Sequence, residues 1–390
     1  MTILFFSRLF YPHIGGVEKH VLEVGKRLVK KNHKVIVVTE GTLIKDIPVY
    51  QSTSMSAKVT GEVDGIKIHR IPVGRKQNQY SRHAGLSSIS HSRERFWVRS
   101  AYQNDVIGVV AKDTWFKKFK IWWWLWQHKD LIKNADIIHC HDVFFWYLPF
   151  RFIYPNKKVY ITFHGYETKF PPSKKAILIR KISEWLSWGN ICVGDYIKKW
   201  YGTKSDYVTY GAVDLKTQNS KLKTQNYSSK LKILFIGRLE EDTGVLIYLK
   251  ALELMRQKKI SFEFEACGNG SLRGEVERYG MVYGFVKDIG KYIVRSDFVF
   301  TSSYLSILEA ISRGKIVFSV FQNKLKEDYL KMSPFAKWII IENSPEKIIE
   351  KIHYFMKHQK EKKEILDIAY SWVKMQTWEK VISIYLQLWK

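Results

Sequence analysis

The chain has 390 residues, of which 46% are hydrophobic and 26% charged, and its 64 Lys and Arg outnumber 37 Asp and Glu to give a formal charge of +27. Such a chain has room for two α/β domains, and the lack of any run of 18 apolar residues argues against a membrane-spanning helix. The charge favours an anionic partner of some kind: nucleic acid, lipid headgroups or a phosphorylated substrate. The amino-acid usage of the genome would explain the charge equally without any function.

The N-terminus and the cysteines both point to the cytoplasm. Met1–Arg8 lacks the basic flank and cleavage site of a signal peptide, so it is predicted as a first buried strand. Cys140, Cys192 and Cys267 lie far apart among apolar residues, with neither metal-ligand nor redox spacing. We therefore expect reduced thiols inside a cytoplasmic protein.

The chain begins with a predicted strand–helix–strand unit. Strands are expected at 3–6 and 35–39, and the apolar spacing between them predicts a helix over 16–32. Gly15 and Gly16 stand where this helix begins, and adjacent glycines there allow a phosphate to approach the backbone. The pair alone is equally compatible with an ordinary turn.

Three stretches follow with different characters. Residues 50–64 are polar and predicted as a loop, 66–72 as a strand, and 74–99 as a mobile, basic surface segment. Residues 115–133 are predicted as one helix, in which the tryptophans of Trp115–Trp126 are interspersed with lysines. That composition fits an element at a membrane interface, or aromatic residues packed beneath the sheet.

Histidines mark the ends of the next two strands. His139 and His141 share a face of a strand over 135–142, but without a third ligand in view we expect no metal site. The strand over 158–162 ends at His164, a position where α/β folds place reactive side chains, although a loop cap is the commoner role. Two further strands complete the first half, at 190–193 and 207–210.

A change of character separates the two halves. Residues 215–230 are polar and contain a near-perfect tandem repeat, so they are predicted as a linker. Residues 365–390 are predicted to be helical and too apolar to stay unpacked, so they should return to the first domain. Strands of a second α/β series are expected at 232–236, 262–267, 281–285, 298–300 and 315–321.

The stretch from Phe298 to Lys315 has the sequence pattern of a strand, loop and helix that form one half of a nucleotide pocket. A strand is followed by the hydroxyl residues 301–303, where the N–H groups of a new helix should point toward an anion. Glu309 falls about one turn into that helix, where a carboxylate accepts hydrogen bonds from a ribose. An ordinary capped helix with a surface glutamate would show the same pattern.

Taken in chain order, these motifs resemble the glycosyltransferase family 4 enzymes of the GT-B fold. The matching segments are Gly15–Glu18, Asp136–Asp142, His164-Gly165, Phe235–Leu239, Leu308–Ala310 and Thr377–Lys380. The resemblance implies an α/β protein with two Rossmann-like domains that face each other across a cleft. Its implied parts are an acceptor domain at 1–205, a linker at 206–231, a donor-nucleotide domain at 232–371 and a helix at 372–390 that returns to the first domain.

The resemblance also implies a function. It predicts a retaining transfer of a hexose from a nucleoside diphosphate sugar to a lipid-linked or polysaccharide acceptor, without a metal or other cofactor. His164, against the transferred sugar, and Arg238, on the diphosphate, are the implied catalytic residues. Glu309 would hold the ribose. The implied donor-binding residues are Gly15, Gly16, Arg238, Tyr304, Leu305, Ser306 and Glu309.

Two positions depart from the family pattern. Thr301 stands where the first glutamate of the family's paired motif is expected, unless the loop is shortened, and Thr243 stands where a phosphate-binding lysine is expected. These departures keep open a non-catalytic relative that binds sugar nucleotides, and a sugar-nucleotide 2-epimerase is a minor alternative. No nucleic-acid-binding motif is present, so the expected partners are a sugar nucleotide, a glycan or lipid-linked acceptor and an anionic membrane surface, with the protein peripheral on its inner face.

Overall fold

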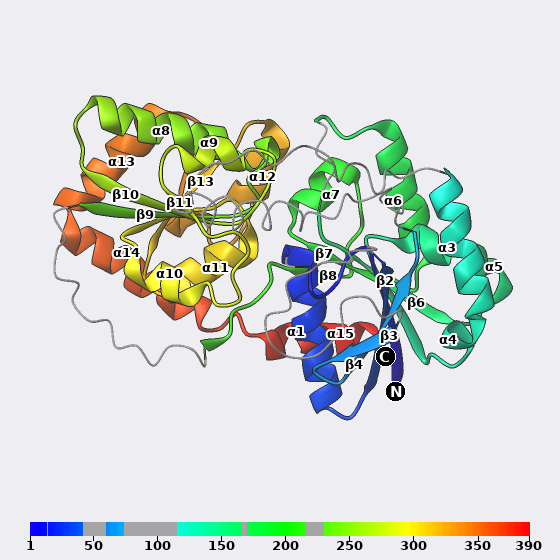
Figure 1. Cartoon of the computed structure of the whole chain (residues 1–390). Helices are drawn as coiled ribbons and strands as arrows, with labels where there is room; N and C mark the ends of the chain where they lie inside the picture. The colour runs from blue at the N-terminus through cyan, green and yellow to red at the C-terminus, as the bar shows by residue number, and fades with distance from the viewer. Residues whose placement is uncertain (14, 42–59, 74–114, 166–169, 216–229) are drawn as a thin grey trace, which may run out of the picture. The chain divides into compact units, whose positions relative to one another are not determined.

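The computed structural model describes residues 1–13, 15–41, 60–73, 115–165, 170–215 and 230–390 (Figure 1). These residues form two compact units, Met1–Tyr160 and Ile161–Lys390, and each is described by itself. The predictions for 50–59, for 74–99 and for the tandem within 216–229 lie outside the described residues.

An eight-stranded sheet runs through the first unit into the second, because the boundary between the units falls within β6. Its strand order is β3-β4-β2-β1-β5-β6-β7-β8, and β1 pairs in parallel with both β2 and β5. The strands are β1 (Thr2–Ser7), β2 (Lys34–Glu40), β3 (Thr60–Val63), β4 (Ile66–Ile71), β5 (Ile137–His141), β6 (Lys158–Phe163), β7 (Gly189–Val193) and β8 (Tyr207–Thr209).

The prediction of a loop through residue 64 is wrong for β3. Thr60–Val63 pairs antiparallel with β4 at the edge of the sheet, where one face stays in solvent and a polar sequence is tolerated. Asp64 and Gly65 join the two strands, and both have positive φ. An Asp-Gly pair between two strands is a strong hairpin signal, so the sequence did contain the information.

The helices of the first unit are α1 (Gly16–Lys30), α3 (Trp115–Gln127), α4 (Lys129–Lys133) and α5 (Phe144–Ile153). The predicted single helix over 115–133 is therefore divided at His128, whose ring stacks on Trp124 with centroids 3.9 Å apart. A buried ion pair holds α3 on the sheet: Lys117 Nζ lies 2.8 Å from Glu40 Oε1, and their side chains are 4% and 5% exposed.

Within the second unit, α15 (Trp378–Leu388) packs on strands of the eight-stranded sheet. Tyr385 Oη lies 3.0 Å from Thr162 Oγ1 in a buried contact, and the N–H of Val213 donates to the carbonyl of Gln376. The predicted continuous helix over 365–390 is interrupted, because Thr377 caps α15 by accepting from the N–H of Lys380. The other helices of this part are α6 (Lys174–Leu186) and α7 (Tyr196–Tyr201).

The second unit also contains a six-stranded sheet in the order β11-β10-β9-β12-β13-β14, with parallel pairing throughout. Its strands are β9 (Leu231–Ile236), β10 (Phe262–Cys267), β11 (Met281–Val282), β12 (Phe298–Phe300), β13 (Ile316–Val320) and β14 (Ile340–Glu342). Parallel pairing explains why nearly continuous apolar runs predicted the first five of these strands. The prediction missed β14, a three-residue strand at the edge of the sheet.

Helices cover both faces of this sheet, as Figure 1 shows, with α8 (Val245–Gln257) and α13 (Pro345–Lys357) on one side and α10 (Gly290–Arg295), α11 (Tyr304–Ser312) and α14 (Gln359–Val373) on the other. The remaining helices are α9 (Arg273–Glu277), α12 (Lys324–Lys331), η2 (Glu241–Thr243) and η3 (Ala336–Trp338). The doubly wound arrangement places the loops after β9, β12 and β13 at one edge of the sheet.

Two further expectations concern single residue types and helix lengths. The three cysteines are free thiols in buried positions, as predicted. Within the described ranges, none of the helices combines the length and apolarity needed to cross a bilayer.

Candidate active site

Three neighbouring loops form the candidate site at the C-terminal edge of the six-stranded sheet. Phe300 of β12 pairs with Phe235 of β9 on one side and with Phe318 of β13 on the other. The three strands are parallel, so the loops that follow them emerge side by side. Loops at this edge are where open α/β sheets bind ligands.

Arg238 follows β9 and presents its guanidinium to solvent. Its side chain is 57% exposed, and Nη2 lies 2.6 Å from Oδ2 of Asp242 in the same turn. An exposed pair of this kind is worth only about 0–1 kcal/mol. The guanidinium is therefore held only weakly by Asp242 and could exchange it for the two oxygens of a diphosphate at little cost.

Thr243 has a structural role in the same turn. Its hydroxyl lies 3.0 Å from the carbonyl oxygen of Arg238 and 2.7 Å from that of Glu240, so it closes η2. Gly244 follows with φ +81°, and a Cβ there would lie 2.4 Å from Cγ2 of Val320. These contacts keep the turn compact and require glycine at residue 244. Because the hydroxyl of Thr243 is bonded within the turn, the side chain of residue 243 is not directed to an anion.

The loop after β10 supports the turn that carries Arg238. Gly268 has φ +155°, and a Cβ on it would lie 1.7 Å from the carbonyl oxygen of Gly237, so the two backbones touch directly. The N–H of Gly237 donates to the carbonyl of Cys267 at 3.2 Å, and Glu240 accepts from the N–H of Ser271 at 2.8 Å. Arg238 thus stands on a rigid support.

The helix α11 begins three residues after β12, so the connection is short. Ser303 is its N-cap in an extended conformation, and Tyr304 is already engaged: its N–H donates to Oη of Tyr329 at 3.1 Å, and the two rings stack at 4.0 Å. The N–H groups of Leu305 and Ser306 belong to the first turn, whose donors have no acceptor inside the helix. These amides, rather than that of Tyr304, are therefore the candidates for binding an anion.

Two residues of this segment concern the predicted carboxylate pair. Glu309 lies half-buried on α11, about one and a half turns after the N-cap. Residue 301, just before the helix, is a fully buried threonine, and the second carboxylate of the family's pair is therefore absent at that position.

Ser302 is the centre of a buried hydrogen-bond network. Its hydroxyl lies 3.1 Å from Oη of Tyr248 and accepts from the N–H of Val320 at 3.0 Å. Its carbonyl oxygen accepts from Nζ of Lys326 at 2.6 Å. The loops after β12 and β13 are therefore joined through one serine, and this joint brings a lysine that sequence reasoning missed to the sheet edge.

His164 lies half-buried directly after β6. The next residue, Gly165, accepts through its carbonyl from the guanidinium of Arg180, which is 8% exposed and lies over the ring of Tyr201 at 4.1 Å. Arg180 therefore positions the start of the loop that carries His164. In the sequence of α6, nothing distinguishes Arg180 from the neighbouring lysines of the same helix.

The glycine pair lies in the first unit, at the start of α1. Gly15 is the N-cap, and a Cβ on it would lie 2.3 Å from Oε2 of Glu18, whose carboxylate covers that position. A Cβ on Gly16 would meet none of the described atoms within 4 Å. His13 lies 3.6 Å from Glu18 and balances part of its charge when protonated. Gly16 is thus the more accessible of the two glycines.

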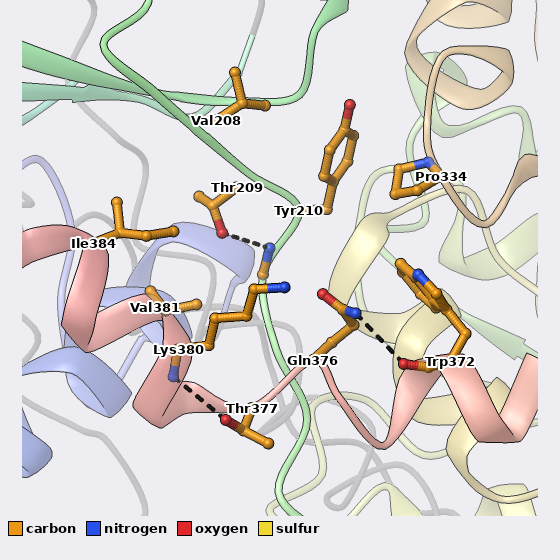
Figure 2. A pocket seen from close by; sticks show the side chains of 11 residues that line it. Val208, Thr209, Tyr210, Pro334, Trp372, Gln376, Thr377, Lys380, Val381 and Ile384 are labelled. Carbon is orange, nitrogen blue, oxygen red and sulfur yellow. Dashed lines mark hydrogen bonds between the residues drawn. The ribbon is translucent and has the colours of Figure 1, made fainter.

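A pocket of about 270 Å³ lies elsewhere in the second unit, between the end of β8 and the start of α15 (Figure 2). Figure 2 shows Thr209 and Tyr210 on one side, with Trp372 and Lys380 on the other. None of the predicted donor-binding residues lines this pocket, so it is not the candidate site.

Comparison with known protein families decides what this architecture is. Residues 14–215 match the family described as Glycosyltransferase Family 4, and residues 216–372 match the Glycosyl transferases group 1 domain. The chain belongs to glycosyltransferase family 4. It is therefore a glycosyltransferase, as the ordered motifs predicted.

Solved structures agree on the fold. A glycosyltransferase from Rickettsia africae ESF-5 is 16% identical with a TM-score of 0.62, and the match covers 100% of this chain and 97% of that one. A TarM variant from S. aureus, crystallised with UDP, fondaparinux and α-GlcNAc-glycerol, is 11% identical with a TM-score of 0.64, over 100% and 99%. WaaG, a glycosyltransferase of lipopolysaccharide biosynthesis, is 13% identical with a TM-score of 0.57, over 98% and 99%. A comparison with curated proteins finds no match.

These findings confirm the predicted GT-B fold of this glycosyltransferase. Within the second unit, Arg238 lies on the loop after β9, and α11, which carries Glu309, begins after the neighbouring strand β12. Gly15 and Gly16 form a separate feature in the first unit. Sequence reasoning missed Lys326 and Arg180, because the burial that distinguishes them arises only in the folded chain.

Proposed function

We propose that this glycosyltransferase moves a hexose from a nucleoside diphosphate sugar to a lipid-linked or polysaccharide acceptor, with retention of anomeric configuration. The observation that carries the proposal is the sheet edge of the second unit. There, Arg238 lies on the loop after β9, and the loop after the neighbouring strand β12 leads into α11, which carries the half-buried Glu309; this suits a diphosphate beside a ribose.

The proposed roles follow from the chemistry of each group. Arg238 exchanges Asp242 for the diphosphate, since a guanidinium binds two phosphate oxygens at once. The amides of Leu305 and Ser306 add N–H donors, and Glu309 accepts from the ribose hydroxyls. Gly15 and Gly16 are proposed to contribute backbone to the diphosphate from the first unit.

The proposed reaction needs no protein nucleophile. The bond from the anomeric carbon to the diphosphate oxygen breaks, a bond to the acceptor hydroxyl oxygen forms on the same face, and the leaving diphosphate takes the hydroxyl proton. His164 contacts the transferred sugar. The chain's own cations and amides stabilise the charge on the leaving group, so we propose that no metal or other cofactor takes part.

The relatives are consistent with the proposed substrates. The S. aureus TarM variant was crystallised with UDP, and WaaG acts in lipopolysaccharide biosynthesis. Since these proteins share only the fold with this chain, they suggest a class of donor and acceptor and leave the base, sugar and linkage to experiment.

We also propose that the enzyme works at an anionic membrane surface on its inner face, through the outer side of α3. The buried side of this helix holds Lys117, Ile121, Trp124 and Leu125, and most of its other aromatic residues are exposed. The outward residues are Trp115 (67% exposed), Phe116 (70%), Phe119 (60%), Trp123 (65%) and Trp126 (46%).

Lysines accompany these exposed rings. Lys118 lies 4.9 Å from the ring centre of Trp115, Lys120 lies 4.7 Å from that of Phe116, and Lys129 lies 5.2 Å from that of Trp126. Exposed tryptophan with lysine is the chemistry of helices that lie in the headgroup region, where rings enter the interface and cations meet anionic lipids. A lipid-linked acceptor would be available at the same surface.

Donor binding is the experiment that tests the proposed reaction. Purified protein is titrated with UDP-glucose, UDP-N-acetylglucosamine, GDP-mannose and ADP-glucose, and hydrolysis of each donor is followed. At least one donor should bind and be turned over slowly, and both should fall in Arg238→Ala and Glu309→Ala. The matched control is Arg278→Ala, which removes an exposed arginine that pairs with Glu275 in the same unit.

The outcomes separate the alternatives. Failure of the wild type to bind any of the four donors would contradict the proposed donor class. Binding without hydrolysis, or without transfer to a lipid or glycan acceptor, would instead favour a protein that binds sugar nucleotides without acting on them.

A further inference from the structure

The turn that carries Arg238 contributes one cation to the sheet edge. The next position at which a cation would be expected holds Thr243, and its hydroxyl is used within the turn by the carbonyls of Arg238 and Glu240. A diphosphate that leaves as a donor breaks carries more than one negative charge. The edge therefore needs a second positive group from another element.

Lys326 is such a group on α12. It is the third residue of the helix after the N-cap Asn323, and it is 9% exposed. Its Nζ donates to the carbonyl oxygen of Ser302 at 2.6 Å and lies 4.0 Å from the ring centre of Tyr329. Ser302 directly precedes the N-cap of α11, so the ammonium stands beside the start of the helix that is proposed to bind phosphate.

The start of α12 is also tied to the Arg238 turn. Nε2 of Gln322, just before the helix, donates to the carbonyl oxygen of Glu241 at 2.7 Å. The ammonium of Lys326 interacts electrostatically with the Arg238–Asp242 ion pair of that turn: Asp242 attracts it and Arg238 repels it. Lys326, Arg238 and the first turn of α11 therefore contribute positive potential to the same place.

The environment of Lys326 is unfavourable for a charge until an anion arrives. Burial lowers its pKa to about 7, Asp242 opposes this shift and Arg238 adds to it. A buried ammonium beside an arginine and a helix N-terminus gains strongly from a bound phosphate, because desolvation has already occurred. The sequence of α12, with lysines also at 324 and 331, does not indicate that Lys326 alone among them is buried.

We propose that Lys326 is the second cation of the diphosphate site and that it replaces, from α12, the phosphate-binding lysine absent at Thr243. This inference rests on the proposed donor class. It assigns to Lys326 a contact with the leaving diphosphate and thus a part in both donor binding and transfer. The structural alternative is that Lys326 only holds the Ser302 carbonyl and the loop after β12.

The test compares donor affinity in four proteins between pH 6 and pH 9. Calorimetric titrations use UDP-glucose, GDP-mannose and ADP-glucose, whose diphosphate diester keeps a constant charge over this range. The variants are Lys326→Met, which keeps length without charge, and Lys326→Arg, which keeps the charge. The matched control, Lys324→Met, removes a 59% exposed lysine from the same helix.

The expected result is a loss specific to the charge at residue 326. Lys326→Met should bind the preferred donor about 10- to 100-fold more weakly, as for a lost hydrogen bond between charged groups. Lys326→Arg should recover most of the affinity, and Lys324→Met should stay within about twofold of wild type because its charge is solvated.

The pH dependence distinguishes phosphate binding from loop support. Wild-type affinity should fall as the pH rises above about 7, because donor binding then requires a proton to be taken up by Lys326. The charged groups that face Lys326 are Asp242 and Arg238, and its ammonium also lies over the ring of Tyr329. Lys326→Met should bind with an affinity that is nearly independent of pH.

Each outcome has a distinct meaning. If the wild type binds no donor, the proposed donor class fails and this inference fails with it. If the wild type binds a donor, and Lys326→Met binds equally with the same pH profile, the inference is overturned while the donor class stands. If Lys326→Met does not fold, a wild-type affinity that is flat with pH overturns the inference instead, as does an affinity of Lys326→Arg that declines above pH 7 as steeply as that of the wild type.

Discussion

Two regions of this glycosyltransferase concentrate positive charge, and they do so in opposite ways. At the edge of the six-stranded sheet, Lys326 is buried and hydrogen-bonded to a backbone carbonyl, and Arg238 stands on a turn locked by glycine contacts. On the outer side of α3, Lys120 is exposed and Lys118 is half-buried, and both lie over the rings of exposed aromatic residues.

The difference indicates what each region binds. Cations with fixed positions in a partly desolvated place suit a small anion with defined geometry. Solvated cations among exposed rings suit a surface without defined geometry, where contacts average over many lipids. A total charge of +27 therefore does not identify a partner, whereas the burial of the individual cations separates the two proposed binding regions.

The largest expected effect comes from breaking the anchor of α3. Glu40→Gln leaves Lys117 buried without its carboxylate, so the free energy of unfolding should fall by about 3–5 kcal/mol. Denaturant unfolding followed by circular dichroism measures this loss. The control Glu253→Gln changes a 46% exposed carboxylate and should alter stability by less than about 0.5 kcal/mol. An equally small effect of Glu40→Gln would contradict the proposed anchor.

The second prediction concerns the sheet edge. Arg238→Ala should lower the rate of transfer by about 100- to 1,000-fold, because an oriented donor to the developing diphosphate charge is lost. Stability should hardly change, since the arginine is 57% exposed and its ion pair is weak. Steady-state kinetics with the preferred donor provide the measurement, and a loss below threefold would exclude the assigned role.

The third prediction tests the surface of α3. Joint replacement of Phe119 and Trp123 by serine should reduce binding to phosphatidylcholine–phosphatidylglycerol vesicles by about tenfold or more, since two exposed rings no longer enter the interface. Co-sedimentation provides the readout, and Met281→Ser, at a 59% exposed apolar residue, is the control. Wild-type protein that stays in the supernatant would refute the membrane proposal.

The smallest effect is a dependence of stability on pH. The folded pKa of Lys326, about 7, lies below its ordinary value near 10.5, so between these values the unfolded chain binds more protons. Stability should therefore rise with pH from 7 to 9 in the wild type relative to Lys326→Met, by on the order of 1 kcal/mol. Thermal unfolding of both proteins across this range measures it, and parallel curves would contradict a lowered pKa of Lys326 in the folded protein.

The sequence correctly predicted the elements that are buried on both faces, because their apolar runs are continuous. Parallel strands such as β1, β5 and β9 are covered on both faces, so continuous apolar runs identify them. The edge strand β3 was missed because half of it faces solvent. Helix ends at His128 and Thr377 were missed because local side-chain contacts, of His128 with Trp124 and of Thr377 as a cap, occur there without a break in the apolar periodicity.

The candidate site was predictable only where local sequence decides the geometry. Arg238 follows directly from the end of a strand, and Glu309 from the start of a helix. Lys326 could not be found in this way, because its neighbour Ser302 lies 24 residues earlier in the chain. Likewise, only the fold shows that the Tyr304 amide is taken by Tyr329 and that the Thr243 hydroxyl serves its own turn.

A structure of the protein with UDP, GDP or ADP bound tests the central claim most directly. The account predicts that the diphosphate of the nucleotide that binds lies within hydrogen-bond distance of the Arg238 guanidinium and of Lys326 Nζ, with the ribose at Glu309. A nucleotide bound away from this edge, for example in the pocket beside α15, would contradict it.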